Sequence, residues 1–544
     1  MKKLLVAAIA SLAFFTLFRC NVDKLELTNP NQLIPETFFK NEVQVQQAVN
    51  AVYANLQTRG LYQRNLFFAL DNMAQEQLMN PSAEADKVQY SRFTFDATHV
   101  TIREYWKNCY LGINRANFVI SNEDLIRQIP ENELSQPMKD KCIGEARFLR
   151  ALYYFLLVTR FGDVPLFTVN PNANETGFPR VPKAEVWNQI EEDLQIAASQ
   201  CLAKSIEEKG RATSGAAWAL LGKAHLFQAN ASNSQDDYSA AKNAFIQVLN
   251  DNSNYRLEER YLNNFEEETE HGIESVFEVE FQPDLGTADI WSADDGSGNN
   301  EGTFRGMEYG VNDWFNVFVT RNTYDEFETD SDNGIKTDPR RGYCIYSTGD
   351  LYDNDTRTME IADLDFYHYE TDTPWIEHYT RYAWRKYQNY YKSPHEDEVS
   401  GINTRVIRLS DVCLMMAEIE NELGNLDAAV DYLNQVRNRA DVMMPNYGTP
   451  AMDAIYPVSD KEEIRIAIEH ERKVELCGEQ VRFDDLVRWR RLTAFINNEI
   501  KPFLPGYHKN QNYFDPEIHY LWPIPQDEID LNSSIDETDQ NPGY

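Results

Sequence analysis

Apolar residues in the first half of the chain recur at steps of three and four residues, which is the period of one helix face. The first run follows Thr37, whose hydroxyl is suited to cap a helix. Its apolar positions are Val45, Ala48, Val49, Val52, Tyr53 and Leu56. The same period returns at 113–120, 146–156 and 186–197. The pattern predicts that the first half is essentially helical.

A pattern of large and small residues appears twice further along the chain. The first copy contains Trp218, Leu221, Gly222 and His225, followed by Tyr238, Ala241, Phe245 and Val248. The second copy runs from Cys413, Met416 and Ala417 through Gly424 to Ala429, Leu433 and Val436. This pattern is typical of a tetratricopeptide helix pair, in which small residues let two helices approach closely. Because one repeat cannot bury its own face, we expect more degenerate copies elsewhere.

The middle of the chain loses the helical period. Residues 274–281, which read ESVFEVEF, alternate like a short strand. From 283 to about 401 the sequence is rich in Gly, Asp, Asn and aromatic residues. An irregular region of this length is usually functional, so we predict a ligand-binding segment at 283–401. Most of the aromatic cluster at 375–391 is expected to belong to the core.

The run from Glu471 to Trp489 predicts a helix, a turn and a second helix. Gly478 can adopt the left-handed conformation that ends a helix. Charges of opposite sign are frequent in this run, and Arg472 and Asp485 are examples. We expect them to form solvent-facing or partly buried ion pairs with a structural role, not a catalytic one.

The N-terminus has the pattern of an export signal. Two lysines precede an apolar run at 4–18, which is too short for a membrane-spanning helix. Cys20 follows at the position where a bacterial lipoprotein carries its lipidated cysteine, and Leu17 fits the motif before it. Arg19 departs from the small residue that is usual there. The pattern predicts a signal peptide at 1–19 and a lipid anchor on Cys20, with ordinary secretion as the alternative.

Composition limits the classes of partner. The 544 residues, 42% of them hydrophobic, are enough for a large core. A formal net charge of -36 argues against nucleic acid and against an anionic membrane surface, so we expect membrane contact only through the anchor. The other cysteines show no metal-binding spacing and are expected to act mainly as small apolar residues. They are Cys109, Cys142, Cys201, Cys344, Cys413 and Cys477.

Motifs for catalysis and cofactor binding are missing from the sequence. It contains no G-x-S-x-G and no phosphate-binding loop, and the His-Glu pair at 470–471 lacks the second histidine of a zinc site. Asp330, Asp332 and Gly334 partly match a calcium loop, but the glycine comes one position early and the final glutamate is missing. We therefore expect a protein that is not an enzyme and that has no cofactor and no metal.

Several short sequence blocks occur in one order along the chain. They are NP at 29–30, FF at 38–39, NRAN at 114–117, EARFLRA at 145–151, RFGDVP at 160–165, GRA at 210–212, RLSDV at 408–412, the run at 471–489, LWPIP at 521–525 and QNPGY at 540–544. Together and in this order they resemble the SusD/RagB family of Bacteroidetes surface lipoproteins. The resemblance implies a mostly α fold, in which four tetratricopeptide-like units carry a large irregular ligand-binding region and a few short strands.

The resemblance also implies a function and a partner. Such proteins bind a nutrient at the outer membrane and hand it to a SusC-like TonB-dependent transporter. We expect an oligosaccharide ligand, while a peptide-binding member of the family and a tetratricopeptide adaptor for a protein partner are the alternatives. The expected parts are a signal peptide at 1–19, a lipidated linker at 20–36, an N-terminal SusD-like helical region at 37–270 and a C-terminal RagB/SusD region at 271–544.

Two segments correspond to the family's binding residues, namely 71–99 and 291–318. Asn312, Asp313 and Trp314 occupy the position of the family's ligand arc, and Trp314 is the leading candidate because an aromatic face stacks on a sugar ring. Further candidate platforms are Trp291, Phe304, Tyr309, Tyr90 and Phe93. The early segment reads QLMNP where starch-binding members carry tryptophans, so we do not expect a starch binder.

Overall fold

The N-terminal half of the molecule is helical, as the apolar period predicts. The computed structural model describes residues 35–80, 83–172, 175–283, 301–330, 334–360, 382–397, 399–502 and 512–544. The helices of this half are α2 (Pro35–Phe38), α3 (Glu42–Ala54), α4 (Asn65–Met73), α5 (Ala85–Arg92), α6 (Val100–Ile120), α7 (Glu123–Arg127), α8 (Gln136–Phe161), α9 (Lys183–Gln200), α10 (Ser214–Ser232) and α11 (Gln235–Leu249). Thr37 lies within α2, and Asn41 caps α3 by accepting the backbone N–H of Gln44 at 3.1 Å.

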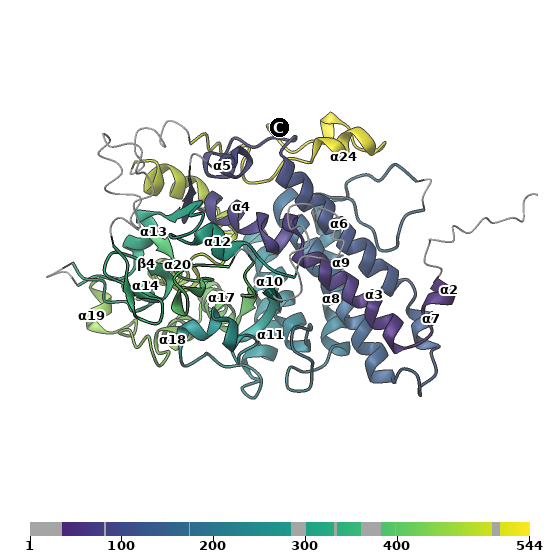
Figure 1. Ribbon diagram of the computed structural model, residues 1–544, viewed down its shortest axis with the longest axis horizontal. Helices are drawn as coiled ribbons and strands as arrows, with labels where there is room; N and C mark the ends of the chain where they lie inside the picture. Colours follow the sequence, from purple (N-terminus) through teal and green to yellow (C-terminus); the bar gives the residue numbers. More distant parts are fainter. Residues whose placement is uncertain are drawn as a thin grey trace, which may run out of the picture.

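Successive long helices pack against one another in a row. Helix α3 packs on α6, α6 on α8, α8 on α9, α9 on α10, α10 on α11, and α11 on α17 (Leu409–Glu422), which packs on α18 (Leu426–Arg437). Figure 1 shows α3, α6, α8 and α9 side by side at one end of the molecule, with the irregular segments at the other end. The row contains four helix pairs, so the predicted tetratricopeptide-like scaffold is confirmed.

Both copies of the predicted repeat form helix pairs. In the first copy, a Cβ atom built on Gly222 would lie 2.7 Å from the Phe245 ring, so α10 and α11 approach closely at this glycine. In the second copy, Gly424 has a φ of +82° just after α17, where the chain turns into α18. The two copies are joined by Asn230, whose amide donates to Glu418 at 3.0 Å.

Short strands and short helices make up most of the remaining structure. The described residues form four antiparallel strand pairs, which are β1 (Gln77–Met79) with β3 (Val317–Val319), β2 (Ser275–Val279) with β8 (Thr404–Arg408), β4 (Ile345–Tyr346) with β7 (Ala383–Trp384), and β5 (Leu351–Tyr352) with β6 (Arg357–Thr358). The other α-helices are α12 (Arg305–Tyr309), α13 (Arg321–Glu326), α14 (Arg340–Cys344), α19 (Pro450–Asp453), α20 (Lys461–Leu476), α21 (Arg482–Arg488), α22 (Leu492–Ala494) and α24 (Gln526–Leu531). Short 3₁₀ and π segments are η2 (Asn55–Gln57), η3 (Arg59–Gln63), η4 (Tyr261–Asn264), η5 (Glu267–Thr269), η7 (Asn389–Tyr391), η8 (Phe495–Ile500) and η9 (Glu537–Asp539). The strand predicted at 274–281 is confirmed as β2.

A network of buried ion pairs holds the C-terminal half together. Glu471 and Glu475 lie one turn apart on α20. Glu475 accepts hydrogen bonds from Arg408 at 2.7 Å, Arg439 at 2.9 Å and Arg340 at 3.1 Å, and Arg340 also binds Glu471. All five side chains are at most 1% exposed. Helix α20 therefore anchors α14, β8 and the end of α18.

The network reaches two further segments. Glu274, just before β2, accepts from Arg408 at 2.8 Å, and Lys386, just after β7, donates to Glu479 at 2.7 Å. Burial alone would raise the pKa of Glu274, but Arg439 and Arg408 lower it to about 2. Its carboxylate is therefore charged throughout the physiological pH range.

The charges near the end of the chain are more deeply buried than the sequence suggested. Arg472 on α20 binds Asp485 on α21 at 2.7 Å, and Arg160 on α8 binds Asp484 on α21. All four residues are buried. The prediction of solvent-facing or partly buried ion pairs is wrong for Arg472 and Asp485, because this pair joins α20 to α21 and both side chains lie in the interface between these helices.

Most of the apolar and aromatic predictions for the core hold in the described residues. Trp384, Tyr387 and Tyr390 are buried, whereas Trp375 and Tyr379 lie outside the described residues. The six cysteines within the described ranges are all buried and unpaired. No described helix combines the length and the apolar character needed to cross a bilayer.

The close approach at Gly222 predicts the effect of a larger side chain. Gly222→Leu should lower the free energy of unfolding by about 1 to 3 kcal/mol, because the added atoms collide with the Phe245 ring. Gly342→Ala on α14 is the control, since a Cβ there meets no atom within 4 Å. Urea unfolding followed by circular dichroism measures both variants. An unchanged midpoint for Gly222→Leu would contradict the tetratricopeptide packing.

Candidate ligand-binding site

The two segments expected to carry the ligand site lie side by side in the structure. Strand β1 from the early segment pairs with β3 from the central segment, with Leu78 opposite Phe318. The pairing continues beyond the strands, since the N–H of Asn80 donates to the carbonyl of Asn316 and the N–H of Thr320 donates to Glu76, each at 2.9 Å. The fold thus joins two segments that are about 240 residues apart in sequence.

Trp314 lies in the turn between α12 and β3. Its ring is only partly buried and stacks on the Phe304 ring, with centroids 5.9 Å apart and an angle of 25° between the planes. Phe304 is itself buried against Val399. The backbone N–H of Trp314 donates to Met307 at 3.2 Å, which fixes the turn on α12. The indole therefore rests on a rigid apolar base and keeps part of its surface exposed.

Asn312 and Asp313 hold this turn in place. The Asn312 amide donates to the Pro394 carbonyl at 3.0 Å. One oxygen of Asp313 accepts from the Tyr390 hydroxyl at 2.7 Å and from the backbone N–H of Glu396 at 3.0 Å. These bonds connect the turn to the segment at 389–396. The position of Trp314 thus depends on both segments.

Glu396 is a buried carboxyl group beneath the turn. One of its oxygens accepts the backbone N–H of Asn389, and the side chain also lies against Gly306 on α12. Burial raises the pKa of Glu396 to about 8, and the carboxylate of Asp313 adds to this effect. Glu396 is therefore mostly protonated at neutral pH, which avoids two adjacent buried negative charges.

Four of the predicted aromatic platforms are buried, each at most 2% exposed. Tyr90 bonds Thr101 through its hydroxyl at 2.6 Å, and Phe93 packs edge-on against Phe514 at 5.1 Å. Phe304 supports Trp314, and Tyr309 packs edge-on against another ring of the core. None of the four offers a free face to a ligand, so their assignment as platforms is corrected to core. Trp291 lies outside the described residues.

The structure adds one exposed polar group that sequence reasoning missed. The His395 side chain is 62% exposed, and its Nδ1 lies 3.5 Å from Asp313. No local pattern pointed to His395, because its contact with Asp313 joins distant segments. Within the described ranges no three His, Cys, Asp or Glu side chains group as metal ligands would. Asp332 lies outside these ranges, so the acidic turn at 330–334 is only partly described.

The fold is a helical-repeat scaffold, and the turn between α12 and β3 presents a partly exposed aromatic ring on it. The chain belongs to the SusD family, whose model matches residues 273–544. A second family model, described as starch-binding associating with outer membrane, matches residues 23–226. The resemblance inferred from the ordered sequence blocks is thus confirmed.

Relatives and solved structures match the chain over nearly its whole length. The SusD-like protein P2 of Formosa agariphila is 27% identical and covers 100% of both chains. A crystal structure of a SusD superfamily protein from Bacteroides vulgatus is 25% identical, has a TM-score of 0.73, and covers 93% of this chain and 100% of its own. A laminarin-binding SusD-like protein is 25% identical, with a TM-score of 0.70 and the same coverage.

The raised pKa of Glu396 predicts a pH-dependent loss of stability. Unfolding returns the pKa from about 8 toward 4.5, so this residue stabilises the fold below pH 4.5 and loses that contribution as pH rises toward 8. Glu396→Gln mimics the protonated form and should escape this loss. Between about pH 5 and pH 8, the free energy of unfolding of the variant should rise by on the order of 3 kcal/mol relative to that of the wild type. Thermal unfolding at a series of pH values measures this difference.

The matched control for this measurement is Glu208→Gln, because the Glu208 side chain is 72% exposed. The free energy of unfolding of this control should vary with pH as that of the wild type does. Parallel stability curves for Glu396→Gln and the wild type would show that the Glu396 carboxyl is not buried as described.

Proposed function

We propose that this chain is a surface-exposed outer-membrane lipoprotein that binds an oligosaccharide and delivers it to a SusC-like TonB-dependent transporter, without catalysing a reaction. The observation that carries the proposal is the partly exposed Trp314 ring on a turn that is held by hydrogen bonds. Membership of the SusD family and the expected lipid anchor on Cys20 support it. The partner and the outward orientation follow from what the family resemblance implies.

The chemistry around Trp314 suits a sugar. An indole face packs on the apolar side of a pyranose ring, and nearby polar groups can bond its hydroxyls. The exposed imidazole of His395 is one such group. The net charge of -36 favours a neutral or cationic ligand over an acidic polysaccharide.

Comparison with a glycan-binding relative supports a polysaccharide ligand. The laminarin-binding SusD-like protein shares 25% identity and covers 93% of this chain, so laminarin is a reasonable first probe. Starch is disfavoured, because residues 77–79 of the early segment form β1 and are all buried. A peptide ligand is the alternative, and a peptide panel beside a glycan array separates the two.

Replacing Trp314 should weaken binding without unfolding the protein. The ligand is the strongest binder from a glycan array, and calorimetry measures its affinity. Trp314→Ala should weaken its binding by about 1 to 3 kcal/mol, the order of magnitude found for aromatic side chains that stack on nucleic-acid bases. Trp314→Phe keeps a ring on Phe304 and should retain most of the affinity. Circular dichroism of both variants should match the wild type.

The control for this experiment is Trp218→Ala on α10, in the helical repeat. Trp218 packs on the main core while remaining partly exposed. Its loss should lower stability by about 2 to 3 kcal/mol and leave ligand affinity unchanged. A Trp314→Ala protein that binds normally, or that unfolds as readily as Trp218→Ala, would overturn the assignment of Trp314.

The lipid anchor is tested by cell fractionation. Cys20 is the expected lipidated residue, and it lies outside the described residues. Cys20→Ala should move the protein from the outer-membrane fraction to the soluble fraction, because a triacylated cysteine binds a bilayer far more firmly than a single chain does. Arg19→Gly should restore the usual small residue before the cysteine and speed maturation. Identical fractionation of the wild type and Cys20→Ala would remove the lipoprotein proposal.

A further inference from the structure

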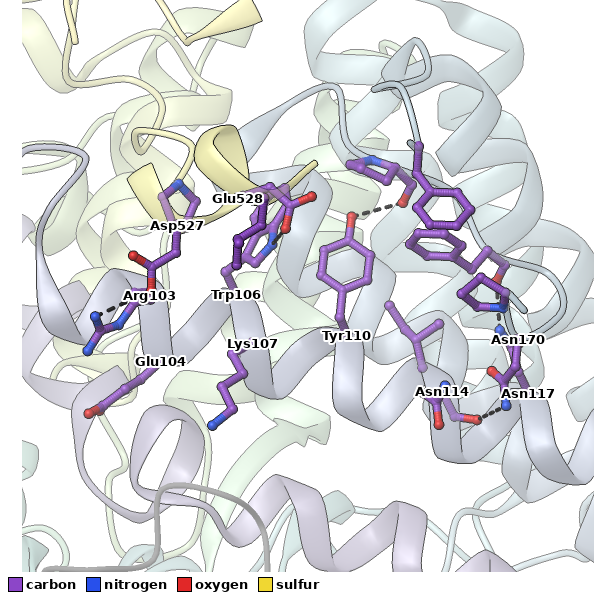
Figure 2. A pocket seen from close by; sticks show the side chains of 17 residues that line it. Arg103, Glu104, Trp106, Lys107, Tyr110, Asn114, Asn117, Asn170, Asp527 and Glu528 are labelled. Atoms are coloured by element: carbon purple, nitrogen blue, oxygen red, sulfur yellow. Dashed lines mark hydrogen bonds and ion pairs between the residues drawn. The ribbon is translucent and has the colours of Figure 1, made fainter. Parts of the chain in front are cut away.

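A groove of about 610 Å³ runs along α6, on the helical scaffold (Figure 2). Residues from Arg103 to Asn117 on α6 form one wall, and α24, residues 165–171 and Phe178 form the others. The groove contains none of the residues around Trp314. The groove is therefore separate from the turn of Trp314, which carries the proposed sugar site.

The floor of the groove is aromatic, and several of its polar groups are bonded within the protein. The Tyr110 hydroxyl donates to the Pro165 carbonyl at 2.8 Å, and the Trp106 indole N–H donates to Glu528 at 3.1 Å. The Asn117 amide donates to the Phe167 carbonyl at 3.0 Å. What the floor mainly offers an occupant is ring surface, on which aliphatic side chains can pack.

Large apolar side chains beside the groove are unusually exposed. Leu531 on α24 lines it and is 79% exposed. Val169, next to the lining residue Asn170 along the chain, is 60% exposed. Exposed apolar side chains beside a groove fit a place where another segment binds.

The described chain begins at one end of this groove. Phe38 and Phe39, the first aromatic residues of the described structure, pack on Phe118 with ring centroids 5.8 Å and 5.1 Å away. Phe118 lies one turn beyond Asn114 on the same face of α6, and Asn114 lines the groove. The described chain therefore starts close to this end of the groove.

The preceding segment, 21–34, has the reach and the side chains to fill the groove. The α6 stretch from Arg103 to Asn117 is about 21 Å long, which about seven extended residues would span. The segment has four large aliphatic residues, which are Leu25, Leu27, Leu33 and Ile34. The second family model begins its match at residue 23, so most of this segment belongs to the sequence that the family shares.

The far end of the groove carries charges of both signs, because Glu104, Asp527 and Glu528 line it and Arg103 pairs with Asp527. Arg103 and Lys107 lie there, and Lys107 has no ion-pair partner among the described residues. Asp23 and Glu26 would approach this end if residue 34 lay at the other, because the segment would then run parallel to α6. Exposed pairs of this kind favour one register while adding little affinity.

We propose that residues 21–34 of this chain lie in the groove along α6. Their aliphatic side chains cover the aromatic floor, and their acidic residues lie at the end of the groove that holds Lys107. Residue 20 then leaves the protein beside α24 and the N-terminal end of α6. In a lipid-anchored protein this docking would fix which face of the scaffold lies toward the membrane.

Cross-linking in the chain from Asn21 to Tyr544 tests the proposal. Asn31→Cys is combined with Leu531→Cys, and a short bismaleimide is added; the six native cysteines of this chain are buried and do not compete. The control pairs Asn31→Cys with Ile206→Cys, because Ile206 is 70% exposed and lies outside the groove. The intramolecular cross-link to position 531 should form at least about tenfold faster than the control, because docking raises the local concentration of the two thiols.

Equal cross-linking rates for the two pairs would overturn the proposal. A second measurement uses Leu531→Glu without added cysteines and laminarin as the probe. If laminarin binds the wild type and Leu531→Glu abolishes this binding, the groove is a glycan site and the linker does not occupy it. Laminarin binding that is weakened by Trp314→Ala and unchanged by Leu531→Glu supports both the docked linker and the proposed sugar site.

Discussion

The buried ion network centred on Glu471 and Glu475 is the constraint on which the C-terminal half depends. Removing several arginines and carboxylates from water costs several kcal/mol per ion, and this cost is offset only when every charge is paired with good geometry. Here the partners come from α14, β8, the end of α18 and α20. If one of these elements moved away, a buried charge would be left without its partner. The network therefore ties the position of each element to that of the others.

This constraint extends from the scaffold to the ligand face. Lys386 donates to the carbonyls of Glu475 and Cys477 at 3.0 and 2.9 Å, and to the side chain of Glu479. The chain then continues directly to Tyr390 and Glu396, which hold the turn of Trp314. Pairing of β1 with β3 fixes the same turn from the other side. A ring held in this way loses little conformational freedom on binding, which favours affinity.

Local sequence pattern accounts for the scaffold because helices are local structures. The three- and four-residue period located α3, α6, α8 and α9, and the large and small residues located the pairs α10 with α11 and α17 with α18. The deep burial of Arg472 and Asp485 was missed because their surroundings are made by other helices. Periodicity shows that a residue lies on a helix face, but it does not show what covers that face.

The candidate site was predictable only in part for the same reason. The family resemblance pointed to the turn at 312–314, and in the structure the Trp314 ring there rests on Phe304 and is partly exposed. Tyr90 and Phe93 looked equivalent in sequence, yet tertiary contacts bury both. Glu396 and His395 carried no signal, because the raised pKa of Glu396 and the exposure of His395 arise from packing between distant segments.

Hydrogen–deuterium exchange of the whole protein, with and without the strongest ligand from a glycan array, tests the central claim most directly. The account predicts ligand-dependent protection at 304–319 and 389–397, where the braced turn and its supports lie. Exchange in α8 and α9 should stay unchanged, because these helices belong to the scaffold. Protection confined to the helical repeats, with none in the turn of Trp314, would contradict the account.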